Sequence, residues 1–301
     1  MPEKSLSANS YRPRRAVLFV PASNEKAIAK LSSLACDAVI FDLEDSVAPE
    51  AKAAARERLK AWFKARPKNS MECVIRVNPL ASEWGADDIA AACACAPDAV
   101  LLPKVNTPRD IHDFDDALDE ADAPENLWLW ILVETPMALL NIGALAEFGR
   151  DRAARLDCFV AGTNDLIKDT GVLATPDRRY IMPWLMHMVL AARAGGLDML
   201  DSVSNDFRDL DAFTRECAEG AAMGFDGKTL IHPAQIEPAR MAFSPSAEAI
   251  ADAEAIRSAF TLPENMGKGV ISIDGRMVER LHLAQAERLL ARAGRFSGRR
   301  L

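Results

Sequence analysis

The sequence predicts an α/β fold, a (β/α)8 TIM barrel with a C-terminal helical and hairpin extension. Apolar segments alternate with helix-like segments at a spacing of about thirty residues, and eight such units match the length of this barrel. The strand segments are continuously apolar rather than alternating, which is typical of a parallel sheet covered on its outer face. An open doubly wound sheet is the alternative, but no Gly-x-Gly-x-x-Gly motif follows any strand segment.

The first half of the chain contains four strand segments, and capping residues or prolines mark where helices begin. Ser23-Asn24-Glu25 is a capping sequence for the first helix, and Pro49 is suited to the first turn of the second. The expected strands are residues 16–20, 38–41, 73–78 and 99–104.

Residues 131–137 give the clearest pattern in the second half. An apolar run ends in Glu134, and Thr135 and Pro136 suit the N-cap and first turn of a helix. Glu134 is therefore expected at the C-terminal end of a buried strand. The remaining strands are expected at residues 158–161, 199–203 and 225–231, with a helix near 209–223 before the last.

The alternating pattern stops after residue 240. A helix near 247–260, a glycine-flanked strand pair within 269–278 and a last helix from Leu281 follow. This extension is expected to act as a lid or a subunit contact. The predicted parts are a flexible N-terminal tail (1–13), a catalytic barrel (14–240) and the C-terminal extension (241–301).

Composition narrows the class of partner. The net charge of −8 and the pI of about 5.2 argue against nucleic acid. The six cysteines follow no zinc-binding spacing and are expected to be reduced thiols in a cytoplasmic protein. No apolar run reaches the roughly 18 residues of a membrane span. The polar start lacks the apolar core of a signal peptide and is expected to be a poorly ordered tail or, less in keeping with Glu3, a transit segment.

Charged residues gather where the predicted strands end, which is where barrel enzymes place their catalytic groups. Glu134 and Asp165 follow neighbouring strands, and two carboxylates beside open backbone suit a hard divalent cation. None of the four histidines is paired at metal-binding spacing, so Mg²⁺ or Mn²⁺ is expected rather than Zn²⁺. The strand ends carry Glu44, Asp45, Arg76, Lys104, Glu134, Asp165, Asp201 and His232.

These residues also have a structural interpretation. The two carboxylates would then cap helices or pair with Lys104 and Arg76. Arg76 interrupts an apolar strand and needs an anionic partner; its functional interpretation is polarisation of a carbonyl and binding of a carboxylate. A Schiff base at Lys104 is disfavoured because carboxylates keep an amine protonated.

A basic cluster lies before the first strand. Arg12, Arg14 and Arg15 form either a solvated face or part of a polyphosphate site. In the second case Lys26 and Lys30, beyond the end of that strand, would complete it.

Seven ordered motifs carry a family resemblance: RRAVLFVP at 14–21, FDLEDSV at 41–47, RVN at 76–78, LPKV at 102–105, VET at 133–135, GTNDL at 162–166 and GKTLIHP at 227–233. Together they resemble the citrate lyase β-subunit-like branch of the HpcH/HpaI aldolase family, over residues 14 to about 290. That branch includes malyl-CoA and citramalyl-CoA lyases and malyl-CoA thioesterases.

The resemblance implies a (β/α)8 barrel, usually a homotrimer or a dimer of trimers, with Mg²⁺ held by Glu134 and Asp165. Arg76 would contact the carbonyl of an α-keto acid or the acyl oxygen. The family usually has an aspartate as acid/base in the C-terminal piece, where this chain has Glu279. This difference weakens the expectation of thioesterase activity more than the expectation of metal binding. Substrate or CoA contacts are implied for Phe19, Lys26, Lys30, Ile231 and His232, with Glu44, Asp45 and Lys104 supporting the site.

The expected function is therefore Mg²⁺-dependent, reversible Claisen-type cleavage of a 3-hydroxyacyl-CoA. Malyl-CoA or citramalyl-CoA would give acetyl-CoA plus glyoxylate or pyruvate. The alternatives are a malyl-CoA thioesterase, a metal aldolase acting on substrates without CoA, and a citrate lyase β subunit that works only in a complex.

Overall fold

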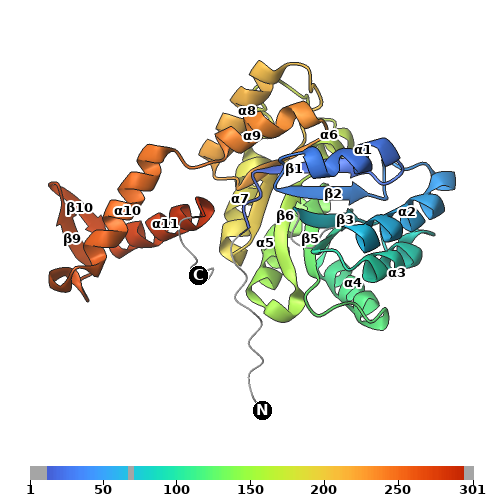
Figure 1. Cartoon of the computed structure of the whole chain (residues 1–301), viewed down its shortest axis with the longest axis horizontal. Coiled ribbons are helices and arrows are strands. Elements are labelled where there is room, and N and C mark those ends of the chain that lie inside the picture. The colour runs from blue at the N-terminus through green and yellow to red at the C-terminus, as the bar shows by residue number, and fades with distance from the viewer. Residues whose placement is uncertain (1–11, 67–70, 295–301) are drawn as a thin grey trace, which may run out of the picture. The chain divides into compact units, whose positions relative to one another are not determined.

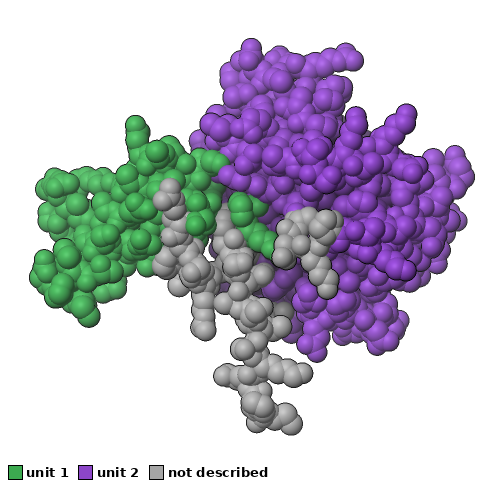
Figure 2. All heavy atoms as spheres, viewed as in Figure 1, with its two compact units in different colours: residues 1–13, 244–301 green, residues 14–243 purple. Residues whose placement is uncertain are grey.

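The computed structural model describes residues 12–66 and 71–294. Its contacts divide the chain into two compact units, residues 14–243 and a smaller unit that contains residues 244–301 (Figure 2). The boundary after Phe243 lies three residues beyond the predicted one after residue 240. The predicted N-terminal tail lies outside the described residues, apart from Arg12 and Pro13.

The larger unit is a closed barrel of eight parallel strands in sequential order (Figure 1). Each strand pairs with the next, and β8 returns to pair with β1, which confirms the predicted fold and excludes the open doubly wound sheet. The strands are β1 (Ala16–Pro21), β2 (Ala38–Asp42), β3 (Glu72–Arg76), β4 (Ala99–Leu102), β5 (Trp128–Val133), β6 (Leu156–Ala161), β7 (Asp198–Asp201) and β8 (Gly227–Leu230).

Helices surround this barrel, and local chemistry sets where they begin. The Asn24 side chain accepts a hydrogen bond from Ala27 N at 3.0 Å, and Thr135 Oγ1 accepts one from Ala138 N at 3.0 Å. Both are N-caps that satisfy amide groups of the first turn. The helices are α1 (Glu25–Lys30), α2 (Lys52–Ala65), α3 (Gly85–Cys95), α4 (Pro108–Glu120), α5 (Pro136–Glu147), α6 (Thr163–Thr170), α7 (Met182–Gly195), α8 (Leu210–Met223) and α9 (Ile236–Ala242).

The barrel strands are apolar on both faces because each face is covered. In β2, Ile40 packs in the barrel interior, whereas Val39 and Phe41 pack against the outer layer that contains the helices. Trp130 of β5 is fully buried and occupies the interior cluster. This two-sided burial explains why the strand segments read as continuous apolar runs.

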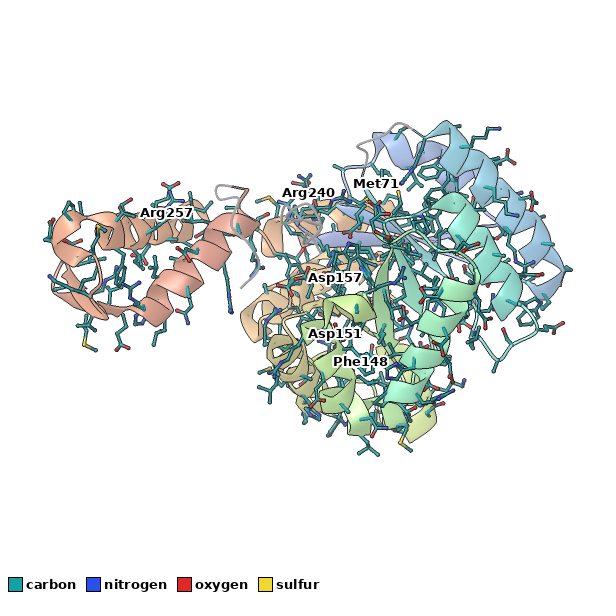
Figure 3. All side chains as sticks on the ribbon, turned by 90° about the horizontal axis from the view of Figure 1, so that it is seen from below. Met71, Phe148, Asp151, Asp157, Arg240 and Arg257 are labelled. Carbon is teal, nitrogen blue, oxygen red and sulfur yellow. The ribbon has the colours of Figure 1, made fainter. Side chains whose placement is uncertain are left out.

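The end of the barrel from which the strands start is closed by an ion cluster. Arg14, immediately before β1, is 3% exposed, and its guanidinium lies 4.6 Å from the Trp130 ring centre. It pairs with Glu72 at 2.7 Å, Asp157 at 2.5 Å and Asp198 at 2.8 Å; Asp157 is labelled in Figure 3. The interpretations of the basic cluster as a solvated face or polyphosphate site are therefore wrong for Arg14, because three buried carboxylates already neutralise it.

The C-terminal unit has the predicted helix, hairpin and helix. It consists of α10 (Ala247–Thr261), the antiparallel strands β9 (Val270–Ile273) and β10 (Arg276–Glu279), and α11 (Arg280–Arg292). Ile256 and Phe260 of α10 pack with Val278 and Leu290 in a small core of its own. None of the helices in the described part of the chain is long and apolar enough to cross a lipid bilayer.

Candidate active site

A cavity of about 410 Å³ opens at the C-terminal ends of the barrel strands. This is the end where barrel enzymes build their sites. Apolar and charged side chains both line this cavity. Its lining includes Phe19, Asp42, Asp45, Arg76, Leu132, Glu134, Gly162, Asp165, Thr229 and Ile231.

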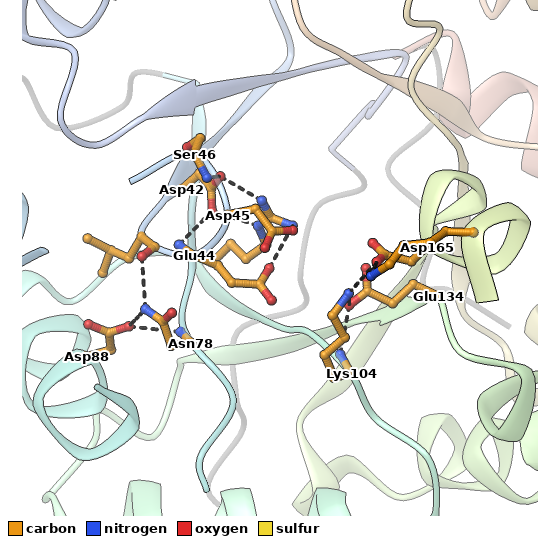
Figure 4. A network of polar contacts seen from close by, with 12 residues as sticks. Asp42, Glu44, Asp45, Ser46, Asn78, Asp88, Lys104, Glu134 and Asp165 are labelled. Carbon is orange, nitrogen blue, oxygen red and sulfur yellow. Dashed lines mark hydrogen bonds and ion pairs between the residues drawn. The ribbon is translucent and has the colours of Figure 1, made fainter. Parts of the chain in front are cut away.

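Glu134 and Asp165 meet in this cavity, as expected for neighbouring strand ends. The Lys104 side chain reaches between them: its Nζ lies 3.3 Å from Glu134 Oε1 and 2.9 Å from Asp165 Oδ1 (Figure 4). The backbone amide of Lys104 also donates a hydrogen bond to Glu134 Oε1 at 2.9 Å. One cation therefore already lies within contact distance of both carboxylates.

The two carboxylates differ in their electrostatics. Glu134 is 1% exposed, and burial raises its pKa to about 7 against the opposing effect of Lys104. Burial also disfavours ionisation of Asp165, but the hydrogen bond and charge of Lys104 outweigh it and lower the pKa of Asp165. Burial likewise opposes the charge on Lys104, yet the two carboxylates together raise its pKa. The ammonium is thus firmly protonated, as the sequence predicted from its acidic neighbours.

Glycine at position 162 is required for this arrangement. A Cβ atom there would lie 2.4 Å from the Cβ of Glu134 and 3.2 Å from its Oε2. The Gly162 amide donates to Val133 O at 2.9 Å, which continues the pairing of β6 with β5. The absence of a side chain lets the β6–α6 turn approach the carboxylate closely.

Arg76, the last residue of β3, forms the second charged group of the cavity. Its Nε and Nη2 donate to the two oxygens of Asp42 at 2.7 and 2.6 Å, and Nη1 lies 2.8 Å from Glu44 Oε2. Burial disfavours its charge, but the bidentate bond to Asp42 outweighs this and raises the pKa of Arg76. Its guanidinium also lies 5.2 Å from the Phe19 ring centre. This buried arginine therefore has the anionic partner that the sequence required.

Asp42 is the site residue that sequence analysis missed. It ends β2 directly opposite Arg76, and the register pairs these two positions. Its oxygens also accept from the amides of Glu44 at 2.9 Å and Ser46 at 3.1 Å, which shapes the β2–α2 turn. The sequence contained a sign of this role, because Asp42 ends the apolar run of the strand before the one that carries Arg76. Only the β2–β3 register shows that Asp42 and Arg76 face each other.

Glu44 is a buried acid beside these groups. Its Oε2 is close to Arg76 but is not aligned for a hydrogen bond, and no other described group supplies one. Burial raises the pKa of Glu44 to about 8, with the charges of Glu134 and Asp45 adding to the effect of burial and Arg76 opposing it. Lys52 stabilises the turn that carries Glu44, because its Nζ donates to Leu43 O at 2.7 Å and to Glu44 O at 2.9 Å.

Other predicted site residues are more dispersed. Phe19 and Ile231 line the cavity, whereas Lys26 and Lys30 are exposed on α1. His232 caps the turn after β8 and stacks on Phe207, with ring centres 4.6 Å apart. These positions are compatible with contacts to a ligand that extends out of the cavity.

Asp201 belongs to a separate, fully buried cluster. It lies 3.0 Å from Lys228 Nζ and 2.8 Å from Arg178 Nη1. Its appearance among the strand-end charges is therefore explained by structural ion pairs. Glu279 lies in the C-terminal unit, where its side chain accepts from the first turn of α11 as a cap.

The Glu134–Asp165 pair fits a hard divalent cation. Its donors are carboxylate oxygens, and the ammonium between them shows that the geometry accommodates a positive charge. Among the described residues, no group of three or more His, Cys, Asp and Glu side chains could hold a metal ion. Two protein ligands leave the rest of the coordination shell to water or substrate oxygens, which is typical of Mg²⁺.

Comparison with known proteins identifies the family. The profile described as HpcH/HpaI aldolase/citrate lyase matches residues 15–233, which is almost the whole barrel. The chain belongs to the HpcH/HpaI aldolase/citrate lyase family. This confirms the resemblance drawn from the seven motifs.

Curated relatives in this family match nearly end to end. A (3S)-malyl-CoA thioesterase of Cereibacter sphaeroides is 41% identical over 286 residues, 95% of this chain and 96% of the relative. The human mitochondrial citramalyl-CoA lyase is 36% identical, covering 94% of this chain and 86% of the relative. Citrate lyase subunit beta of Escherichia coli is 29% identical, covering 96% of both. An enzyme was predicted, and membership of this HpcH/HpaI lyase family confirms it.

A solved structure in the family supports a divalent metal cofactor. The protein CitE of Mycobacterium tuberculosis, described in complex with magnesium, acetoacetate and coenzyme A, is 30% identical with a TM-score of 0.71, covering 94% of this chain and 98% of that one. A citrate lyase beta subunit from the same organism is described as complexed with oxaloacetate and magnesium. Those ligands are a metal, small oxo acids and CoA.

Proposed function

We propose that the protein is a Mg²⁺-dependent carbon–carbon lyase that reversibly cleaves a 3-hydroxyacyl-CoA carrying a carboxylate at C3. Malyl-CoA would give acetyl-CoA and glyoxylate, and citramalyl-CoA would give acetyl-CoA and pyruvate. The observation that carries the proposal is one cavity in which the Glu134–Asp165 pair and the Arg76 guanidinium meet at the C-terminal strand ends. The relatives named as citramalyl-CoA lyase and citrate lyase subunit beta support it.

Glu134 and Asp165 would hold the metal, with Mn²⁺ as a possible substitute. When bound, Mg²⁺ would act as a Lewis acid toward the hydroxyl and carboxylate oxygens of the substrate. Gly162 keeps the β6–α6 turn against Glu134, and the Lys104 amide fixes one oxygen of that carboxylate. These contacts orient the carboxylates before a substrate arrives.

Arg76 would stabilise the charge that moves during cleavage. The substrate hydroxyl would give its proton to a water molecule in the cavity, the C3–O bond would become a carbonyl, and the C2–C3 bond would break with its electron pair passing to the thioester enolate. A guanidinium beside the reacting oxygen stabilises that negative charge. Asp42 holds Arg76 by two hydrogen bonds, so the donors are oriented before reaction. Protonation of C2 would complete acetyl-CoA, with the proton coming from a water molecule or from Glu279, whose segment resembles the family's C-terminal piece that covers a neighbouring subunit's site.

Substrate contacts follow from the remaining predicted residues. Phe19 and Ile231 would pack against the acyl portion in the cavity, and His232 would provide a hydrogen bond near its mouth. Lys26 and Lys30, exposed on α1, would attract the phosphates of CoA. A cytoplasmic homotrimer, with the C-terminal extension as lid or subunit contact, completes the proposal.

Thioester hydrolysis is the second candidate, because the 41% identical relative from Cereibacter sphaeroides is named a malyl-CoA thioesterase. Glu279 stands where the resemblance implies an aspartate. Its extra methylene moves the carboxyl group by more than about an ångström, which matters for proton transfer. A lyase that releases acetyl-CoA and a hydrolase that releases free CoA are separated by their products.

The test is a condensation assay on the purified protein. Acetyl-CoA or propionyl-CoA would be incubated with glyoxylate, pyruvate or oxaloacetate and Mg²⁺, and adducts identified by mass. We expect a hydroxyacyl-CoA from one pair, its loss in chelator, and at least a hundredfold slower formation by Glu134→Gln. Full activity of that variant, or turnover only of substrates without CoA, would contradict the proposal; free CoA without adduct would favour the thioesterase. Dependence on co-purified subunits would indicate a citrate lyase component.

A further inference from the structure

Lys104 places its ammonium group where the proposed metal would bind. Its Nζ lies 3.3 Å from Glu134 Oε1 and 2.9 Å from Asp165 Oδ1. Mg²⁺ binds carboxylate oxygens at about 2.0–2.1 Å. A cation held by these oxygens would therefore meet the ammonium at close range, and two positive charges cannot share this position without strong repulsion.

We propose that Lys104 is an internal counter-ion of the metal site, which holds the two carboxylates together before the metal binds and is displaced when it binds. The inference rests on the proposed function, because it takes Glu134 and Asp165 as the metal ligands. Lys104 then competes with the metal and lowers the site's affinity for it.

The carboxylates need such a counter-ion. Glu134 is 1% exposed, and the Asp165 side chain is 24% exposed. Two ionised carboxylates this close, with one of them buried, repel each other and lose hydration. An ammonium between them removes most of that penalty, so the protein folds with the ligands already in place.

Lys104 can leave without dismantling the site, because its two contacts to Glu134 are separate. Its backbone amide donates to Glu134 Oε1 at 2.9 Å, while its side chain supplies the ammonium. The backbone is held in the left-handed region, with φ of 54°, and its carbonyl accepts from Asn106 Nδ2 at 3.1 Å. The side chain is 32% exposed on a flexible four-carbon stem, so the charge can move into solvent while the amide stays bound.

The chain offers a matched control in Lys168 on α6. Its Nζ lies 3.9 Å from the same Asp165 Oδ1, but its side chain is 77% exposed. Replacing either lysine removes one positive charge beside the site. Only Lys104 lies between the two carboxylates, so a simple change of local charge and a loss of competition give different results.

The experiment measures metal binding directly in full-length protein stripped with a chelator. Mn²⁺ is the probe, with its free concentration followed by electron paramagnetic resonance, and Mg²⁺ is measured by competition. We expect Lys104→Met to bind Mn²⁺ roughly tenfold or more tightly than the wild type. Lys168→Met should stay within about twofold, because an exposed charge is screened.

Thermal unfolding provides the second readout. In chelator, Lys104→Met should unfold at a lower temperature than the wild type, and saturating Mn²⁺ should raise its midpoint by more than it raises that of the wild type. If this variant does not fold without metal, Lys104→Gln, whose amide can hydrogen-bond one carboxylate, is measured in the same way. Unchanged or weaker Mn²⁺ affinity in whichever variant folds would overturn the inference.

Failure of the inference and failure of the proposed function are distinguishable. If the wild type binds no Mn²⁺, or if Glu134→Gln binds it normally, the metal site itself is refuted. If the wild type binds Mn²⁺, Glu134→Gln does not, and Lys104→Met binds as the wild type does, only the counter-ion role is refuted.

Discussion

Two lysines of the barrel each bridge two carboxylates, and they differ in exposure: Lys228 is the second residue of β8, and Lys104 follows the end of β4. Lys228 Nζ lies 3.0 Å from Asp201 and 2.6 Å from Glu216, and its side chain is 0% exposed. Lys104 Nζ lies 3.3 Å from Glu134 and 2.9 Å from Asp165, and its side chain is 32% exposed. The chemical groups are the same, and only the surroundings separate them.

The difference shows what makes an ion bridge permanent. Lys228 also donates to Ser202 O at 2.5 Å, so its ammonium has three acceptors and no route to water. Arg178 pairs with the same Asp201 at 2.8 Å, which adds a second cation. The Lys104 side chain is partly exposed to solvent, so its ammonium can move away and another cation can take its place. One bridge stabilises the fold, and the other prepares a site.

The largest expected difference between the Lys228 and Lys104 bridges is in the free energy of unfolding. Lys228→Met should lower the free energy of unfolding by roughly 3–5 kcal/mol, because it leaves Arg178 alone to neutralise the buried Asp201 and the nearby Glu216. Lys104→Met should cost less, since its site is partly hydrated. Urea denaturation of both variants in chelator measures this, with Lys168→Met as the exposed control. Equal losses at the two lysines would show that exposure does not distinguish the bridges.

The pH dependence of stability should differ between Glu44, beside Arg76, and Asp201, beside Lys228; for Glu44 the effect is on the order of 5 kcal/mol. Burial raises the pKa of Glu44 to about 8, so the folded protein keeps a proton that the unfolded chain loses above about pH 4.5. Stability therefore falls as pH rises from about 4.5 to 8. Glu44→Gln should remove most of this slope in chelator, and an unchanged slope would contradict the assignment.

Asp201 should act in the opposite direction. Burial opposes its ionisation, but Lys228 and Arg178 outweigh burial and lower the pKa of Asp201. Its stabilising charge is therefore complete above its unfolded pKa and is lost as pH falls through its lower folded value. Glu44→Gln should leave this acid limb of the stability curve intact.

A smaller effect is expected from the close approach at Gly162. Gly162→Ala places a Cβ 2.4 Å from that of Glu134, so the turn or the carboxylate must move. We expect a loss of roughly 1–3 kcal/mol and weaker Mn²⁺ binding. Gly143→Ala in α5, where a Cβ meets nothing within 4 Å, should instead stabilise by about 1 kcal/mol. Thermal unfolding and metal titration of the pair test this, and normal Mn²⁺ affinity in Gly162→Ala would refute it.

The smallest effect concerns cations that bridge nothing in the cavity. Lys26→Ala and Lys30→Ala should change the free energy of unfolding by at most about 0.5 kcal/mol, because both side chains are exposed. If they attract CoA phosphates, KM for the thioester should rise several-fold with little change in kcat, and the rise should shrink at high salt. Steady-state kinetics at two salt concentrations decide this, and an unchanged KM would exclude these lysines from CoA binding.

The positions of strand and helix ends were predictable because their causes are local. Thr135 and Pro136 begin α5 through capping and a fixed φ, and Glu134 follows the apolar run of β5. Since all barrel strands run parallel, the residues that end them must share one rim. That reasoning places Glu134, Asp165, Arg76 and Lys104 together, and the structure has them there.

Pairing within the rim was not predictable, because it depends on contacts between distant segments. Asp42 faces Arg76 through the β2–β3 register. Asp201 is buried because Lys228 and Arg178 cover it, although it ends its strand as Glu134 does. From the sequence, Arg14 was expected on a solvated face or in a polyphosphate site. In the structure it is buried and pairs with Glu72, Asp157 and Asp198.

By itself, the sequence determined the barrel, the end at which its site forms and the acids available there, because strand period, caps and strand direction are written in neighbouring residues. Only the tertiary structure decided which of those charges form buried ion pairs and which stay partly exposed, where another cation can replace the partner. The reason is that the residues that bury a charge or neutralise it come from segments far apart in the chain. They decide whether a lysine between two carboxylates is a permanent part of the core, as Lys228 is, or a displaceable counter-ion, as we propose for Lys104.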